Sequence, residues 1–374
     1  MRSKTLDILR AVAVLLVIGR HLQPCPPELN AVLHSFTTHW RMGGWIGVDL
    51  FFVLSGFLVS GLLFKEQQRY GTLSPKNFLL RRGLKIYPAF YAMLAATVAV
   101  RLATGKGVPL GGLLREIFFV QNYGPGLQGH TWSLAVEEHF YILLLLVLLV
   151  GMRRQRSDAD GGPFAWLPRF FVTVALLCLG LRLYVHFTTP YFTNFTHQFP
   201  THLRIDSLLF GVLLSYFYHY HAGVWRVWTA RYRGVWAALG MALLLPPFFV
   251  PVEQSNWLSN IGFTMLYTGN GLLLCALADV VPPDNWLVRG VAFVGARSYS
   301  VYLWHVAVMT WLGNGLRGRV GWYAYALVSV LGALAVGVIA AQLLEVPVLR
   351  LRDRIFPSRS QPAATLNGAT SAKL

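Results

Sequence analysis

Long apolar stretches separated by short polar segments recur along the whole chain. A helix needs roughly 20 consecutive apolar residues to cross about 30 Å of hydrocarbon. We count ten candidate spans, at residues 5–22, 44–64, 84–101, 130–151, 170–187, 204–221, 234–250, 260–280, 291–313 and 322–345. The apolar stretch at 113–120 is too short to span and predicts a partly buried or interfacial helix. The pattern therefore predicts an all-α, polytopic integral membrane bundle with about ten transmembrane helices.

Composition supports this class. Hydrophobic residues make up 55% of the 374 residues and charged residues only 13%, whereas a soluble domain has about 25% charged residues. A water-soluble globular protein and a disordered chain are both excluded by this balance. The three cysteines lie far apart and have neither a disulfide nor a metal-ligand spacing. The sequence thus predicts no metal site.

The positive charge predicts an orientation in the membrane. The 32 Lys and Arg residues exceed the 15 Asp and Glu residues by 17, and they cluster in short loops rather than along one polar face. Basic clusters at 65–85, 153–169, 226–233 and 350–359 alternate with poorer loops, of which 251–260 has no Lys or Arg. This pattern indicates cytoplasmic termini in the inner or plasma membrane, and not nucleic-acid binding.

The domain organisation is expected to be simple, with no second domain and no internal repeat. Residues 1–350 are interpreted as one membrane domain. Residues 351–374 are basic, then small and polar, and are expected to form a disordered cytoplasmic tail.

Ionisable residues inside the spans are the candidates for function, because each costs about 2.5 to 3.5 kcal/mol on insertion scales. Arg10 and His21 lie eleven positions apart in the first span. They therefore share one helix face, on the order of 16 Å apart along the axis. In the structural alternative, His21 caps the helix at the interface and Arg10 snorkels to the cytoplasmic side.

Three carboxylates accompany them. Asp49 has no cation within one turn, so an Arg or His from another helix is its expected partner, unless it lies half exposed at the interface. Glu137 and Glu138 are adjacent and point about 100° apart, so at most one easily faces a shared site. Further polar residues near span ends, which interhelical hydrogen bonds would also explain, are Arg204, Asp206, Arg297, Tyr299, Ser300, Tyr302, His305 and Glu345.

These residue types limit the chemistry. The sequence contains no G-x-S-x-G elbow, no H-E-x-x-H pair and no phosphate-binding loop. It does contain a histidine on an Arg-bearing helix, carboxylates that can orient it, and a basic loop able to hold a phosphorylated ligand. That set suits general-base activation of a hydroxyl for attack on an acyl thioester.

Six motifs, in order, resemble the polytopic acyltransferase family 3, which includes O-antigen and surface-glycan O-acetylases. The resemblance extends from Leu6 to Pro347. The motifs are Arg10 with His21, then the runs at 47–57, 78–88, 132–141, 204–211 and 298–305. Two small departures are His139, where the family usually has Gln, and Lys85, where Arg is common.

The resemblance implies a membrane O-acyltransferase in which His21 is the essential histidine. We expect His21 to act as the general base, with Asp49, Glu137 or Glu138 orienting its imidazole.

It also implies that Arg10, Arg81 and Arg82 belong to the path of the donor. The donor substrate is expected to be acetyl-CoA or another acyl-CoA arriving from the cytoplasm, with no tightly bound cofactor. The acceptor is expected to be a hydroxyl of a glycan, glycoside or lipid-linked saccharide, held by the outward loops at 23–44, 106–129 and 191–203.

Two other functions stay open on the sequence. A proton-coupled secondary transporter would use His21, Asp49 and Glu137 as a proton relay. Such a transporter is expected to have two halves with corresponding broken helices, and the sequence has no such symmetry. A catalytically inactive scaffold or sensor is disfavoured by the joint presence of the Arg, His and Glu residues.

Overall fold

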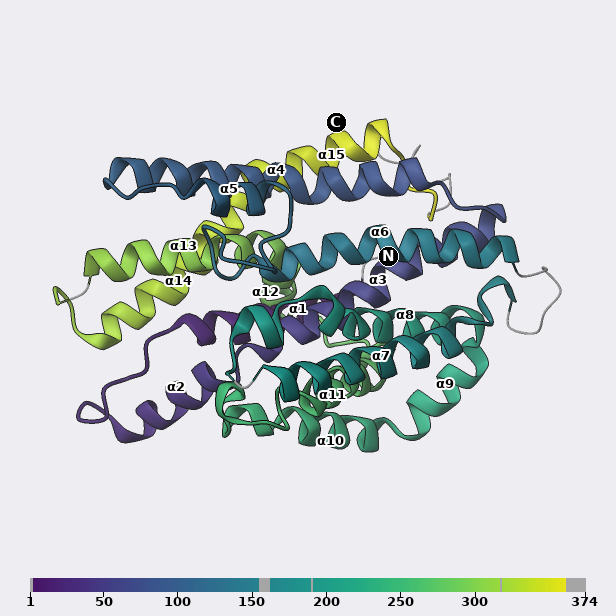
Figure 1. Cartoon of the computed structure of the whole chain (residues 1–374), viewed down its shortest axis with the longest axis horizontal. Helices are drawn as coiled ribbons and strands as arrows, with labels where there is room; N and C mark the ends of the chain where they lie inside the picture. The colour runs from purple at the N-terminus through teal and green to yellow at the C-terminus, as the bar shows by residue number, and fades with distance from the viewer. Residues whose placement is uncertain (1–2, 155–161, 190, 317, 361–374) are drawn as a thin grey trace.

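The computed structural model describes residues 3–154, 162–189, 191–316 and 318–360, and these residues form helices and connecting segments only (Figure 1). In chain order the helices are α1 (Lys4–His21), α2 (Ala31–Gly43), α3 (Ile46–Tyr70), α4 (Pro75–Ala103), α5 (Leu110–Ile117), α6 (Trp132–Arg154), α7 (Leu167–Thr188), α8 (Ile205–Tyr220), α9 (Ala222–Arg231), α10 (Arg233–Leu244), α11 (Ile261–Leu277), α12 (Trp286–Gly295), α13 (Ser298–Leu316), α14 (Trp322–Ala340) and α15 (Val346–Ile355). A π-helical turn, η6 (Ala341–Glu345), joins α14 to α15.

Local sequence signals set several of the helix ends. Ser3 caps α1, where its hydroxyl accepts a hydrogen bond from the Leu6 amide. Pro75 opens α4 in the first turn, where its missing N–H is not needed. Gly71 ends α3 at φ +67°, a left-handed conformation that a residue with a Cβ adopts only with strain.

The long helices run side by side along the long axis of the molecule, and the α3–α4 connection lies at the opposite end from the α4–α5 connection (Figure 1). α3 lies at the centre and packs against α1, α6, α8 and α11. α3 and α8 approach closely because Gly56 and Gly211 have no side chains: a Cβ at Gly56 would collide with the carbonyl oxygen of Leu208. Small residues at such a crossing are typical of membrane helices.

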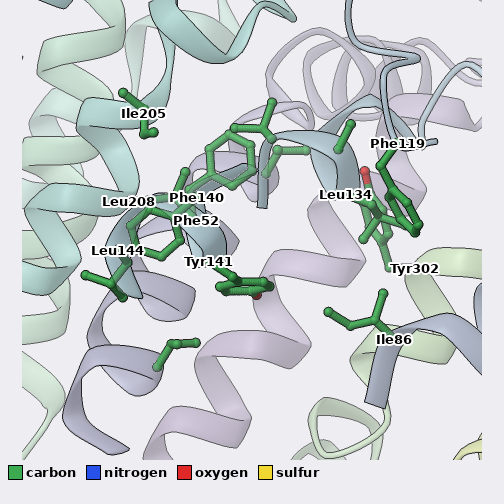
Figure 2. Packing of buried hydrophobic residues seen from close by; sticks show 14 of the residues in the cluster. Phe52, Ile86, Phe119, Leu134, Phe140, Tyr141, Leu144, Ile205, Leu208 and Tyr302 are labelled. Atoms are coloured by element: carbon green, nitrogen blue, oxygen red, sulfur yellow. The ribbon is translucent and has the colours of Figure 1, made fainter. Parts of the chain in front are cut away.

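A large apolar cluster fills the space between α3, α4, α6, α8 and α13. Figure 2 shows Phe52 of α3, Phe140 and Leu144 of α6 and Leu208 of α8 converging in it. All four side chains are buried, so this cluster fixes the positions of the helices that carry the candidate site.

The all-α membrane architecture predicted from the sequence is confirmed. Helical segments long and apolar enough to cross a membrane are Ile46–Tyr70, Pro75–Ala103, Trp132–Arg153, Gly162–Thr188 and Trp322–Ile355, and shorter apolar segments are Arg233–Phe248, Ile261–Leu277 and Trp286–Gly295. The protein is thus a multi-pass membrane protein. The predicted interfacial helix near 113–120 corresponds to α5.

One predicted span is wrong in its continuity. Residues 291–313 were expected to form a single helix, but the chain breaks at Ala296 and Arg297 between α12 and α13. Gly295 packs so closely on α1 that an added Cβ would collide with the carbonyl oxygen of Asp7. Residues 295–298 at the break are Gly, Ala, Arg and Ser, but the apolar residues on both sides make the whole stretch resemble one span.

Two segments contain helical structure that the sequence analysis does not predict. The segment at 23–44, expected to be an outward loop, contains α2, whose polar residues and length of 13 residues give no span signal. In the tail expected from residue 351, α15 continues to Ile355, and Ser358 and Ser360 line a small cavity. Residues 361–374 lie outside the described part of the chain.

The predicted orientation leads to a direct test. Alkaline phosphatase fused at Asn256, in the Lys- and Arg-free segment between α10 and α11, is expected to be active, because that segment should lie outside the cytoplasm. A fusion at Arg226 in α9 is the matched control, expected to be inactive as a phosphatase and fluorescent as a GFP fusion. Fluorescence from GFP at Asn256 would reverse the predicted orientation.

Candidate active site

A cavity of about 440 Å³ lies among α1, α3, α4, α6, α13 and the η6–α15 segment. Its charged lining residues are Arg10, Arg82, Lys85, Arg297 and Arg352 together with Glu137 and Glu345. One wall is apolar and includes Phe51, Leu54 and Leu58 of α3. The cavity thus combines an excess of cations with an apolar wall inside the bundle.

Glu137 faces this cavity from α6. Its carboxylate accepts a hydrogen bond from the Tyr141 hydroxyl at 2.8 Å, and that hydroxyl also lies 2.8 Å from the Ser55 hydroxyl. The Arg82 guanidinium lies 5.1 Å from the centre of the Tyr141 ring, within the range of a cation–π interaction. Glu137 is therefore held by neighbours within the cavity wall.

Glu138 points elsewhere, as its adjacency to Glu137 predicts. Its carboxylate accepts a hydrogen bond from the Tyr87 hydroxyl of α4 at 2.9 Å, and it does not line the cavity. Only Glu137 of the pair faces the cationic cavity.

Asp49 forms a buried ion pair with Arg204 at the start of α8. The side chains of both residues are 0% exposed. Beside them, Asp206 and Arg182 form a second buried ion pair at 2.9 Å. The sequence-based expectation that the partner of Asp49 is a cation from another helix is thus confirmed.

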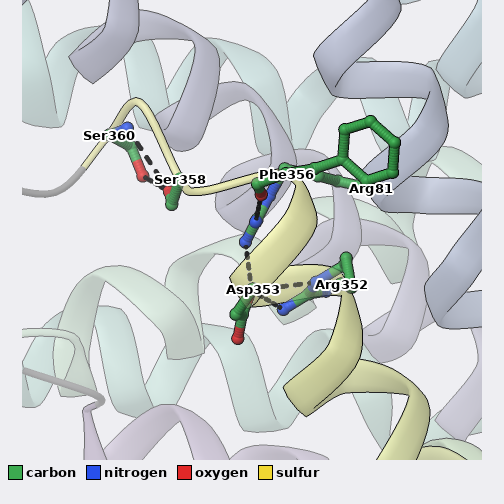
Figure 3. Close-up of polar contacts among 6 residues, drawn as sticks. All are labelled: Arg81, Arg352, Asp353, Phe356, Ser358 and Ser360. Atoms are coloured by element: carbon green, nitrogen blue, oxygen red, sulfur yellow. Dashed lines mark hydrogen bonds and ion pairs between the residues drawn. The ribbon is translucent and has the colours of Figure 1, made fainter. Parts of the chain in front are cut away.

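The three cations expected on the donor path occupy different positions. Arg10, which forms an ion pair with Asp7 at 3.2 Å, and Arg82 both line the large cavity. Arg81 does not. It forms an ion pair with Asp353 of α15 at 2.9 Å and donates a hydrogen bond to the carbonyl oxygen of Phe356 (Figure 3).

Arg81 lines a second cavity, of about 250 Å³. It shares Leu62, Arg82, Lys85 and Arg352 with the large cavity, so the two adjoin. Arg359 lines it too and forms an ion pair with Glu66 at 3.1 Å. The C-terminal segment therefore adds basic side chains at one end of the cationic cavity.

His21 is the last residue of α1 and its side chain is exposed. Its ring lies 5.1 Å, centre to centre, from that of His305 in α13. The His305 ring in turn lies 5.0 Å from that of His130, which lies two residues before the start of α6. Three segments distant in sequence thus bring three imidazoles together, and we call this group the histidine cluster.

The expected carboxylate partner of His21 is not found in the described residues. Asp49 contacts Arg204, Glu137 contacts Tyr141 and Glu138 contacts Tyr87, whereas the neighbour of His21 is another histidine. The roles assigned to these carboxylates therefore stay predictions, and the geometry places Glu137 in the cavity rather than beside the imidazole.

Tyr302 joins the cavity to the histidine cluster. Its hydroxyl lies 2.6 Å from the Ser133 hydroxyl and donates a hydrogen bond to the carbonyl oxygen of His130 at 2.7 Å. Both Tyr302 and Ser133 line the large cavity. The Tyr302 ring also contacts the rings of His130 and His305.

Glu116 of α5 secures the loop that carries His130. Its carboxylate accepts hydrogen bonds from the Thr131 hydroxyl at 2.9 Å and from the Gln128 amide at 3.0 Å. Burial raises the pKa of Glu116 to about 7. The sequence pattern predicts α5 only as a partly buried or interfacial helix, so this anchoring is visible only in the structure.

Sequence reasoning gave no role to two members of the cluster. His305 was noted only as one polar residue near a span end, and His130 was not singled out. The signal was available in part, because His130 lies two residues before the 132–141 motif and His305 ends the 298–305 motif. Within the described residues, no group of three or more His, Cys, Asp or Glu side chains is arranged to hold a metal ion.

The described residues thus form a multi-pass helical bundle with a cationic, apolar-walled cavity beside a histidine cluster. The profile of the acyltransferase 3 family, described as an acyltransferase domain, matches residues 3–342. The chain therefore belongs to this acyltransferase family, and the resemblance drawn from the six motifs is confirmed.

Relatives of known name agree with this assignment. The chain is 28% identical over 354 residues to a Staphylococcus aureus (strain COL) protein provisionally named O-acetyltransferase SACOL0978, covering 86% of this chain and 53% of the relative. It is also 28% identical over 382 residues to O-acetyltransferase OatA of S. aureus (strain NCTC 8325 / PS 47), covering 94% of this chain and 58% of OatA. The chain thus spans little more than half the length of these relatives. No solved structure matches it.

Proposed function

We propose that the protein is a membrane O-acyltransferase that moves an acyl group, expected to be acetyl, from acyl-CoA to a hydroxyl of a sugar or glycan acceptor. The observation that carries this proposal is the cationic cavity that ends at Tyr302 and Ser133, next to the histidine cluster. The names of the relatives as O-acetyltransferases support a hydroxyl acceptor.

The shape and charge of the cavity suit an acyl-CoA. Its phosphates would lie at the junction of the two cavities, where Arg82, Lys85 and Arg352 line both. The guanidinium of Arg can donate two parallel hydrogen bonds to phosphate oxygens, so the contact is directional as well as electrostatic. The pantetheine arm would follow the apolar wall of α3, and the thioester would reach the end formed by Tyr302 and Ser133.

The orientation predicted from the basic segments agrees with this path. The segments predicted to be cytoplasmic include residues 65–85 and the segment that follows α15, and residues from both line the second cavity. We therefore propose that the protein spans the inner or plasma membrane and that the donor enters from the cytoplasmic side. His21, at the opposite end of α1 from Lys4, would meet the acceptor from the outer side.

The chemical step follows from His21. Its neutral imidazole takes the proton of the acceptor hydroxyl while the oxygen attacks the thioester carbonyl carbon. The new carbon–oxygen bond forms, the carbon–sulfur bond breaks, and CoA leaves as a thiolate that is then protonated. Arg10, always charged, acts only by electrostatic attraction along the cavity.

The proposal is tested with the full chain in lipid nanodiscs. Isotope-labelled acetyl-CoA as the donor and octyl glucoside as a glycoside acceptor are expected to give labelled O-acetyl glucoside, detected by mass spectrometry. In cells, deletion of the protein is expected to remove O-acetyl groups from a surface glycan. Intact surface acetylation together with no transfer in nanodiscs would refute the proposal. Acetyl-CoA-independent, proton-driven uptake of a solute would favour the transporter instead.

Within this proposal, Arg82 and Arg81 should differ. Removing a charge-assisted hydrogen bond costs about 1.5 to 3 kcal/mol, so Arg82→Gln is expected to raise the KM for acetyl-CoA by roughly 10- to 100-fold. Arg81→Gln should change it less, because Arg81 is engaged with Asp353 and Phe356. Initial rates at varied acetyl-CoA and saturating octyl glucoside measure both.

Lys76→Gln is the matched control, because Lys76 is an exposed cation in the first turn of the same helix. Unchanged donor kinetics in Arg82→Gln, or an equal rise in Lys76→Gln, would contradict the assignment of the cavity to the donor.

A further inference from the structure

The histidine cluster has a feature that general-base action by His21 alone does not require. His305 and His130 are 0% and 4% exposed, and each has one ring nitrogen bonded to a backbone carbonyl oxygen. His305 Nδ1 bonds to the Tyr302 oxygen, and His130 Nε2 bonds to the Leu303 oxygen at 3.1 Å. The other nitrogen of each ring, His305 Nε2 and His130 Nδ1, has no hydrogen-bond partner among the residues that the structure describes.

The backbone contacts fix the tautomers. A carbonyl oxygen only accepts hydrogen bonds, so His305 Nδ1 and His130 Nε2 must both carry hydrogen. In the neutral rings, His305 Nε2 and His130 Nδ1 therefore carry lone pairs. These are two buried acceptors without a donor, an arrangement that folded proteins mostly avoid because each costs free energy.

These two acceptors belong to rings that lie between His21 and the residues at the end of the large cavity. His305 contacts the ring of His21 on one side and the ring of His130 on the other. His130 contacts Tyr302, which lines the cavity. The two unpartnered nitrogens thus belong to rings that form a continuous row from His21 to the cavity end, and no carboxylate in the described residues occupies that row.

We propose that His305 and His130 are the positioning partners of His21 and share the proton that it removes from the acceptor hydroxyl. This inference rests on the proposed acyl transfer. His21 takes the proton as the acceptor oxygen bonds to the acyl carbon, and the lone pair of His305 Nε2 accepts a hydrogen bond or the proton from the resulting imidazolium. His130 Nδ1 extends the row toward Tyr302, and the proton finally passes to the departing CoA thiolate, which leaves as the thiol.

Two substitutions remove the unpartnered nitrogen together with the ring but keep the nitrogen that donates to the backbone. The amide nitrogen of Asn superimposes on His Nδ1, so His305→Asn keeps the donor to Tyr302 and deletes Nε2. The amide nitrogen of Gln matches His Nε2, so His130→Gln keeps the donor to Leu303 and deletes Nδ1. The control is Ser329→Ala in α14. It deletes a buried hydroxyl that, among the described residues, also has no hydrogen-bond partner.

With acetyl-CoA and octyl glucoside, His305→Asn is expected to lower kcat roughly 100-fold, the lower end of the effect of proton-transfer groups. The KM for acetyl-CoA should stay within about threefold, because neither histidine lines the cavity. His130→Gln should lower kcat in the same direction by a smaller factor. Ser329→Ala should match the parent, and thermal unfolding should show all variants folded.

A second measurement needs no variant. In mixtures of H₂O and D₂O, kcat of the parent protein is expected to fall along a curve, which indicates that more than one proton moves in the transition state. A straight line would overturn the relay, as would His305→Asn and His130→Gln variants with parental kcat. If a variant does not fold, the H₂O/D₂O measurement on the parent protein alone tests the relay. A parent that transfers no acetyl group would overturn the proposed function, and the relay with it, whereas an active parent with active variants overturns the relay alone.

Discussion

His21→Ala is expected to lower acyl transfer by a factor of about 10² to 10⁴, the usual effect of removing a general base, and to leave the protein folded. The reason for the second expectation is structural. The His21 side chain is exposed at the end of α1, and within the described residues its contact is with the ring of His305 rather than a hydrogen bond. The loss of that contact should shift the unfolding temperature little.

The measurement compares rates of labelled acetyl transfer and thermal unfolding in nanodiscs. His39→Ala is the matched control, because His39 belongs to α2, which packs against α1. Among the described residues its ring nitrogen bonds to Ser35 in the preceding turn and its ring contacts Phe249. It should keep parental activity. A stable His21→Ala protein with most of its activity would overturn the general-base role and revive the transporter hypothesis.

The fold could be predicted because the apolar stretches are long enough to cross a bilayer as helices. Continuous apolar stretches have one stable solution in a bilayer, because every backbone polar group must be satisfied within the helix. The break between α12 and α13 was not predicted because the apolar residues on both sides of residues 295–298 resemble one span, and the close packing of Gly295 on α1 is a tertiary contact that the sequence does not show.

Several residues of the candidate site could be predicted from the sequence, but the contacts between them could not. Asp49 in an apolar helix required a cation, and Arg204 supplies it. Which carboxylate would meet His21 depends on helix rotation and tilt, which sequence spacing does not fix across different helices. The actual neighbour is His305, and His130 comes from a loop whose position depends on Glu116.

The pairing of Asp49 with Arg204 leads to the largest expected effect on stability. Removing one partner of a buried ion pair leaves an uncompensated charge and costs about 3 to 5 kcal/mol. Asp49→Ala and Arg204→Ala are each expected to destabilise the bundle by that amount, since both side chains are fully buried next to the Asp206–Arg182 pair. Asp49→Leu combined with Arg204→Met should recover much of the loss, because no lone charge remains.

The Lys4–Asp284 ion pair provides the comparison. Its two atoms lie 2.8 Å apart, but the side chains are 49% and 64% exposed, so Lys4→Ala should cost less than about 1 kcal/mol. Denaturant unfolding in detergent measures all the variants, and the coupling free energy of the Asp49–Arg204 cycle follows from the single and double substitutions. If Asp49→Ala is as stable as the parent but inactive, Asp49 acts in the reaction, as the sequence suggested. If its loss of activity follows its loss of folded protein and the double variant regains both, Asp49 acts by holding α3 and α8 together through Arg204.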